Sequence, residues 1–333
     1  DIVLRGRTSL KNFYRSGQED DRRVSSLDYR LLDRRALYQP SIEVSRGCGM
    51  GCGFCQERSE PLQPLKAPEQ LVSELKATLL QDSLIEMTPY FEASMFVPTL
   101  EWTRRFTDAL NAADFAVRFR TEGRVDNIRP ELIPALAEAG LSVLDLGLES
   151  ASELQLTRMK KTKNPSSYLS KASRLLQACA EAGVKVKVNV LLSAGETDDT
   201  VEETITWLDS HREAIFGVSV GPVIVYGWPQ AVSGYLDDLI SLGASVHHRP
   251  CVGVSHLNLS PTMDHERAVG LARSISRRYM TADSYFVLKS FSYFPRDYTY
   301  DAFKRDVLSL TDELSFDATH LRGSGASSAP VLI

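Results

Sequence analysis

Cysteine, long apolar runs and a strong net charge are all scarce in this sequence of 333 residues. The net charge is only −5, so the chain lacks the global positive field that nucleic-acid-binding proteins use. No apolar run approaches the roughly 20 residues needed to cross a bilayer, and no signal peptide is visible. The five cysteines form no paired framework of the kind found in secreted proteins. We therefore expect a cytoplasmic protein without a nucleic-acid or membrane partner.

Three of the five cysteines are concentrated in one glycine-rich segment. Cys48, Cys52 and Cys55 have the spacing C-x3-C-x2-C, and every second residue from Gly47 to Gly53 is a glycine. Thiolates are soft ligands that suit zinc or an iron–sulfur cluster. Glycine allows the backbone to adopt unusual dihedrals and to approach a ligand closely. The segment therefore predicts a metal or cluster site.

The number of thiols limits what this site can hold. A structural zinc site usually closes with four ligands, and a typical [4Fe–4S] cluster has four cysteine ligands. Cys179 and Cys251 stand alone in the sequence, so a cubane cluster would keep one iron open for a small molecule. A Cys3His zinc site remains an alternative, although no histidine lies near the motif. A disulfide would leave one of the three thiols unpaired.

Strand and helix patterns alternate after the cysteine segment. Helices are expected to begin at Pro68, before Trp102 and at Pro130, and two further helices are expected to be capped by Ser166 or Ser167 and by Asp198 or Asp199. The expected strands are 41–45, 84–88, 115–121, 143–147, 185–192 and 218–225. Such alternation predicts an α/β protein with a parallel sheet, either doubly wound or curled as part of a barrel.

Polar residues recur where these predicted strands end. In both kinds of α/β sheet the ligand binds at the carboxyl ends of the strands. We therefore expect one shared polar rim. Its members after the cysteine segment are Glu92, Glu122, Arg124, Glu149, Glu196, Tyr226 and Trp228.

The cysteine spacing, with the aromatic Phe54 before the last cysteine, resembles the signature of the radical SAM superfamily. The resemblance covers residues 27–230, and the family's order and spacing are kept by several downstream motifs. These are Glu122-Gly123-Arg124-Val125-Asp126, Gly147-Leu148-Glu149-Ser150, Met159-Lys160-Lys161 and Gly195-Glu196-Thr197.

Within the superfamily the chain is most similar to the branch that usually carries a cobalamin-binding domain. The segment Asp1–Gly6 resembles the tail of such a domain, which itself is not visible. Two departures from the branch are Leu192 and Ala194, where glycine and proline are usual. A third is Pro89–Ser94, which replaces an acidic pair. Cobalamin is therefore a possible cofactor without a visible binding domain.

The resemblance implies a fold of three parts. Residues 1–39 would be a lead-in segment, and residues 40–230 would form a partial (β/α)6 barrel. Residues 231–333 would form a C-terminal α+β extension that caps the substrate. Its aromatic residues are interpreted as core, with a lid over the substrate as the alternative. They are Phe286, Phe291, Tyr293, Phe294, Tyr298 and Tyr300.

The resemblance also implies cofactors and roles for particular residues. Cys48, Cys52 and Cys55 would hold a [4Fe–4S] cluster whose open iron binds S-adenosylmethionine. Glu149, followed by Ser150, would bind the ribose, and Glu122 and Arg124 would contact the methionine end or close the site. The backbone near Phe54 and the end of the last strand at Val225 would hold adenine. The candidates on the substrate side are Tyr90, Glu92, Tyr226, Trp228 and His248, with Cys251 as a hydrogen-atom donor.

The expected function is hydrogen abstraction from a small molecule by a 5'-deoxyadenosyl radical. Rearrangement, cyclisation, epimerisation and redox reactions in specialised metabolism all remain open. The electron donor would be a flavodoxin or ferredoxin. The absence of further cysteine clusters and of an RNA-binding module disfavours peptide maturation and tRNA methylthiolation. Cobalamin-dependent C-methylation with a truncated corrinoid domain is the runner-up, and a zinc-stabilised binding module is the non-catalytic alternative.

Overall fold

A computed structural model describes most of the chain. The described residues are 31–34, 37–55, 60–80, 87–227, 229–247, 253–290 and 294–307. Five residues singled out from the sequence lie outside these ranges, so their predicted roles stay predictions. They are Trp228, His248, Cys251, Phe291 and Tyr293.

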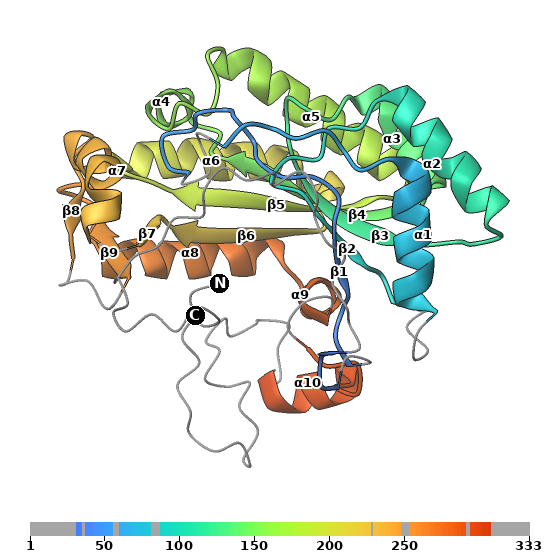
Figure 1. The fold of residues 1–333 in the computed structure, drawn as a ribbon. Helices are drawn as coiled ribbons and strands as arrows, with labels where there is room; N and C mark the ends of the chain where they lie inside the picture. Colours follow the sequence, from blue (N-terminus) through green and yellow to red (C-terminus); the bar gives the residue numbers. More distant parts are fainter. Residues whose placement is uncertain are drawn as a thin grey trace, which may run out of the picture.

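The centre of the fold is a six-stranded parallel sheet in which the strands lie side by side in chain order (Figure 1). This confirms the α/β class, and a partial barrel is consistent with it. The strands are β1 (Ser41–Glu43), β2 (Tyr90–Glu92), β3 (Phe119–Arg124), β4 (Leu141–Glu149), β5 (Lys185–Leu192) and β6 (Gly217–Pro222).

Helices connect the strands and cover the sheet. Figure 1 shows α2, α3 and α5 on one side of the sheet, with α8 and α9 on the opposite side. The connecting helices are α1 (Pro68–Leu79), α2 (Leu100–Ala112), α3 (Ile133–Glu138), α4 (Glu153–Arg158), α5 (Pro165–Glu181) and α6 (Asp198–Ser210). A short 3-10 helix, Pro130–Leu132, precedes α3.

The alternation of side chains along β4 separates the core from the site. Leu144, Leu146 and Leu148 are fully buried in the main hydrophobic core. Asp145 and Glu149, which alternate with them, line a cavity on the other face of the sheet. Because successive strand residues point to opposite faces, the sequence of this one strand places carboxylates on the cavity side.

Two strands lie further along the chain than their sequence patterns predicted. β2 begins at Tyr90, whose amide donates to the Pro40 carbonyl at 2.9 Å, so the predicted strand 84–88 is wrong over residues 87–88, and its other residues are not described. β3 begins at Phe119, whose amide donates to the Gly140 carbonyl at 2.9 Å. Phe115 and Val117 are buried but precede the strand. Consequently Glu92, Glu122 and Arg124 belong to the strands rather than to the loops after them.

The predicted sixth strand, 218–225, divides into two. β6 ends at Pro222, which has no amide hydrogen to extend the ladder. The Val223 amide still donates to the Leu192 carbonyl at 2.8 Å, and then β7 (Ile224–Tyr226) pairs antiparallel with β9 (Val254–Asn258). The large sheet therefore ends before Val225, which belongs to a separate three-stranded sheet of β7, β9 and β8 (Ser245–Val246).

Two helices start slightly earlier than predicted. The Asn164 side chain accepts the amide hydrogen of Ser167 at 3.0 Å, and the Thr197 side chain accepts that of Thr200 at 3.3 Å. The caps are therefore Asn164 and Thr197, because the cap is the residue whose side chain accepts an amide of the first turn.

Within the described residues, the C-terminal part contains the helices α7 (Pro229–Ser241), α8 (His265–Tyr279), α9 (Ala282–Ser290) and α10 (Tyr300–Val307). α8 contacts β6, where the Ser276 hydroxyl accepts the Val220 amide hydrogen at 3.1 Å. The aromatic residues form a second hydrophobic core that includes Val143 of β4. This confirms the core interpretation for Phe286, Phe294, Tyr298 and Tyr300. Among the described residues, no helix has the length and apolar character needed to cross a membrane.

Candidate functional site

The cysteine segment is a loop whose shape depends on glycine. Gly47, Gly49 and Gly51 all have positive φ, at 70°, 66° and 71°. A Cβ at Gly47 would lie 2.2 Å from the carbonyl oxygen of Pro61, which no side chain could tolerate. Because Gly47 has no side chain, the loop can pack closely against the segment around Pro61, which follows it in the chain.

Contacts from distant parts of the chain hold this loop in place. The Cys48 amide donates to the Glu60 carbonyl at 3.0 Å, and the Gly53 amide donates to the Met159 carbonyl at 2.7 Å. The Tyr235 hydroxyl donates to the Phe54 carbonyl. The loop is thus fixed between its own return segment, the end of α4 and α7.

The loop closes one side of a cavity of about 340 Å³. All three cysteines of the motif line it, and none of them forms a disulfide. Eight residues predicted from the sequence come together here: Cys48, Cys52, Phe54, Cys55, Glu92, Glu122, Arg124 and Glu149. The remaining lining residues are Gly51, Ser94, Gly123, Asp145, Gly147, Lys161 and Asn189. Within the described ranges, no three His, Cys, Asp or Glu side chains converge on the position of a single metal ion.

Four other predicted residues do not line the cavity. Ser150 is buried, and its hydroxyl contacts Thr204 Oγ1 at 3.2 Å. Val225 is fully buried in the core, while Tyr226 is exposed at 49%. Tyr90 lies on β2, and the guanidinium carbon of Arg120 lies over its ring, 5.7 Å from the ring centre. Their ligand-binding roles stay predictions.

Tyr90 is nevertheless a neutral hydroxyl next to the cavity. Burial raises its pKa far above the ordinary value, and the carboxylates of Glu122, Asp145 and Glu92 add to this effect. The hydroxyl can therefore donate a hydrogen bond but cannot serve as a phenolate at neutral pH.

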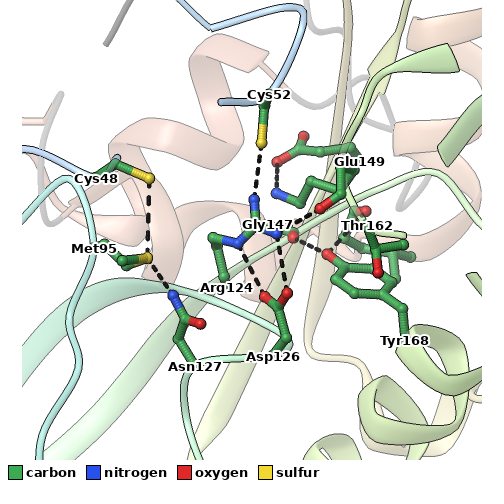
Figure 2. A network of polar contacts seen from close by, with 12 residues as sticks. Cys48, Cys52, Met95, Arg124, Asp126, Asn127, Gly147, Glu149, Thr162 and Tyr168 are labelled. Carbon is green, nitrogen blue, oxygen red and sulfur yellow. Dashed lines mark hydrogen bonds and ion pairs between the residues drawn. The ribbon is translucent and has the colours of Figure 1, made fainter. Parts of the chain in front are cut away.

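Arg124 connects the cysteine loop to the sheet (Figure 2). Its Nη1 donates to the Cys52 sulfur at 2.9 Å, and its Nε donates to Asp126 Oδ1 at 2.9 Å. Nη2 donates to Asp126 Oδ2 at 3.1 Å and to the Lys161 carbonyl at 2.6 Å. Four of the five guanidinium hydrogens are therefore engaged, which fixes the direction of the side chain.

Lys161 forms the next contact in this network, and no role was predicted for it beyond its place in a motif. Its ammonium donates to Glu149 Oε1 at 3.0 Å and lies 5.7 Å from the centre of the Phe54 ring. Both charged side chains are largely buried, with 4% and 15% exposure. Glu149 has a φ of 68° at the end of β4, where the register with β5 shifts. The cavity thus contains a preformed ion pair next to an aromatic ring.

Asp145 lies at the bottom of the cavity and was also missed. Arg120 Nη2 donates to its Oδ1 at 2.8 Å, and Lys187 Nζ lies 2.7 Å from the same oxygen. Burial alone would raise the pKa of Asp145, but the hydrogen bond from Arg120 and the charge of Lys187 hold it below the ordinary value. The alternation Asp145, Gly147, Glu149 was the available signal, because these residues share one face of β4.

Glu196 was expected on the polar rim but is buried beneath it, with 2% exposure. Its carboxylate accepts hydrogen bonds from the Ser193 amide and the Gln155 side chain, both at 3.1 Å, and from Thr200. It therefore ties the end of β5 to α4 and α6. Burial raises its pKa to about 7, against the lowering effect of these hydrogen bonds.

This raised pKa predicts a pH-dependent stability. The folded state holds the Glu196 proton up to about pH 7, and the unfolded state releases it near pH 4.5, so stability falls as pH rises between these values. The loss is on the order of 3 kcal/mol. Urea unfolding at pH 5 and pH 8 should show a smaller decline in Glu196→Gln than in the wild type. Glu202→Gln, on the exposed side of α6, is the control and should retain the full decline. Equal declines in all three proteins would contradict the prediction.

The site fits a thiolate-bound cluster and a small cofactor. The three thiols on the glycine loop supply soft ligands, and the cavity volume lies within the usual range for small-molecule sites, about 300 to 1,000 Å³. Cys179 is different, because burial raises the pKa of its thiol to about 12 in the main core.

Comparisons with known proteins agree with this arrangement. The chain is 26% identical over 166 residues to an anaerobic magnesium-protoporphyrin IX monomethyl ester cyclase of Rubrivivax gelatinosus. It is 27% identical over 192 residues to a tRNA-2-methylthio-N(6)-dimethylallyladenosine synthase of Acidothermus cellulolyticus. These matches cover 48% and 55% of this chain but only 28% and 37% of the relatives. The chain thus spans about a third of the length of the curated relatives it matches.

The fold is similar to that of a solved methyltransferase. The structure of the radical S-adenosylmethionine methyltransferase TsrM from Kitasatospora setae, with tryptophan and a SAM analogue bound, has a TM-score of 0.52. The two chains are 17% identical, and the match covers 65% of this chain and 42% of that one. The family model of the Radical SAM superfamily matches residues 42–208, from β1 through the cysteine loop to α6. The chain therefore belongs to the radical SAM superfamily.

Proposed function

We propose that this protein uses a [4Fe–4S] cluster and S-adenosylmethionine to abstract a hydrogen atom from a small organic molecule in a biosynthetic reaction. The observation that supports this most directly is the shared cavity: three thiols outside any disulfide, two cations and four carboxylates meet within about 340 Å³. When bound, the reduced cluster would supply one electron to S-adenosylmethionine, which gives methionine and the 5'-deoxyadenosyl radical.

The protein's own residues would bind and orient the cofactor. Cys48, Cys52 and Cys55 would hold the cluster. The Glu149 carboxylate can accept hydrogen bonds from ribose hydroxyls, and the Lys161 ammonium beside it can pair with a carboxylate such as that of the methionine end. We assign Arg124 to closing the site, since four of its five hydrogens are already engaged.

The remaining lining residues would face the substrate. Glu92 and Glu122 would accept hydrogen bonds from polar groups, while the Phe54 ring offers an apolar surface to a planar base.

The proposal also covers how the chain divides into parts, its electron donor and its location in the cell. Residues 1–39 would be a lead-in, 40–230 the catalytic barrel, and 231–333 a cap over the substrate. The electron donor would be a flavodoxin or ferredoxin, and the location the cytoplasm, where free thiols persist. No nucleic-acid partner is proposed.

The test is the assay of S-adenosylmethionine cleavage by protein purified without oxygen. Iron, sulfide, zinc and corrinoid are quantified, and 5'-deoxyadenosine is measured after addition of S-adenosylmethionine and a strong reductant. We expect about four irons per chain, the content of one [4Fe–4S] cluster, and formation of 5'-deoxyadenosine. Cys52→Ala should abolish cleavage. Cys179→Ala is the matched control, because this thiol is buried away from the cavity, and it should retain the cluster.

Each other outcome points to a different function. Corrinoid in the purified protein, with methyl transfer from S-adenosylmethionine, would favour the cobalamin-dependent methyltransferase. Zinc without iron after reconstitution, and no cleavage, would overturn the proposal and leave the binding module.

A further inference from the structure

Arg124 presents a buried positive charge to one of the three motif thiols. Its side chain is 7% exposed, and Nη1 lies 2.9 Å from the Cys52 sulfur. Asp126 and the Lys161 carbonyl hold the guanidinium from the opposite side, so its position does not depend on Cys52 (Figure 2).

The thiol of Cys48 has a different neighbour. Its sulfur lies 3.9 Å from the thioether of Met95, which in turn accepts a hydrogen bond from Asn127. A thioether is neutral and a weak hydrogen-bond acceptor. The loop therefore places one thiol beside a cation and another beside an uncharged sulfur.

A cation that donates a hydrogen bond to a cluster ligand favours the more reduced cluster. Reduction adds one negative charge, and hydrogen bonds to the sulfurs are among the factors that set cluster potentials. The effect is strong where solvent is excluded, because the local dielectric is low. Cys52 is itself buried, with 5% exposure.

From this geometry we infer that Arg124 raises the reduction potential of the cluster through its hydrogen bond to Cys52. The inference rests on the proposed function, since it assumes that the three cysteines hold a [4Fe–4S] cluster. Arg124 acts through Cys52 and is a positioning residue. Asp126 supports it by fixing the guanidinium.

The test is a redox titration of the reconstituted protein, followed by the electron paramagnetic resonance signal of the reduced cluster. It is made without S-adenosylmethionine, so that contacts to that cofactor cannot contribute. We expect the midpoint potential of Arg124→Gln to shift to more negative values. Arg124→Lys keeps the charge but loses the fork that Asp126 holds, so it should give a smaller shift in the same direction.

Lys187→Gln is the matched control, because it removes a cation of the same sheet face that pairs with Asp145. It should leave the potential near that of the wild type. An unchanged potential in Arg124→Gln with full iron content would overturn the inference, as would an equal shift in Lys187→Gln. If Arg124→Gln assembles no cluster, a wild-type potential in Arg124→Lys would overturn it. A wild type without iron would overturn the proposed function itself, so the two failures are distinguishable.

Discussion

Asp145→Asn is expected to lower the free energy of unfolding by about 3 to 5 kcal/mol, the cost of removing one partner from a buried ion pair. Asp145 is buried, and it is the shared partner of Arg120 and Lys187. Its loss leaves the guanidinium of Arg120, only 4% exposed, without a counter-charge from Asp145. Urea unfolding at pH 7 measures the effect.

Two comparisons sharpen this prediction. Lys187→Gln should lower the free energy of unfolding by less, since Asp145 keeps its ion pair with Arg120 and the lysine is 19% exposed. The pKa of Asp145 is lowered in the fold, so its contribution is complete above the unfolded value near pH 3.9 and is lost as pH falls below it. Asp145→Asn should therefore flatten the acid limb of stability below about pH 4. If Lys187→Gln lowers the free energy of unfolding as much as Asp145→Asn does, the ion pair with Arg120 is not the main contribution of Asp145 to stability.

Lys161→Met is expected to weaken S-adenosylmethionine binding by roughly 10- to 150-fold, the range for a hydrogen bond to a charged group, 1.5 to 3 kcal/mol. The ammonium is 4% exposed, and its removal leaves Glu149 without its ion-pair partner in the cavity. The dissociation constant of S-adenosylmethionine, measured by equilibrium dialysis of the anaerobic protein, tests this.

The double variant separates the two residues. If Lys161 and Glu149 act as a pair, Lys161→Met combined with Glu149→Gln should weaken binding by much less than the product of the single effects. Lys160→Met is the control, since Lys160 adjoins Lys161 in the chain but does not line this cavity. Binding unchanged in Lys161→Met, with iron content and urea midpoint retained, would remove Lys161 from the proposed site.

The cysteine spacing and the strand–helix alternation predicted the fold class, because both are local patterns that leave few alternatives. The same patterns predicted that Cys52, Glu122, Arg124 and Glu149 lie close together, and all four line one cavity. The exact strand limits were less predictable. β3 starts only where the Phe119 amide meets the Gly140 carbonyl, a contact with the loop that enters β4.

The residues missed or misplaced share a physical cause. The sequence predicts that a side chain follows a strand and so lies near the rim of the sheet. The conformation of the turn then determines the direction in which that side chain points. Glu196 turns inward to Gln155 and Ser193, and Ser150 turns to Thr204. Lys161 reaches the cavity only after Lys160 adopts a φ of 51°. Such turns are settled by tertiary contacts rather than by residue type.

The long-range anchoring of the cysteine loop has a consequence during synthesis. The partners that brace it are far along the chain: Arg124 is 72 residues after Cys52, and Tyr235 is 181 residues after Phe54. At a translation rate of about 5 to 20 residues per second, the thiols emerge roughly 4 to 14 s before Arg124 and roughly 9 to 36 s before Tyr235 closes the loop. During that interval the nascent thiols are open to oxidants and to adventitious zinc. The loop can therefore reach its final shape only after the polypeptide has passed Tyr235.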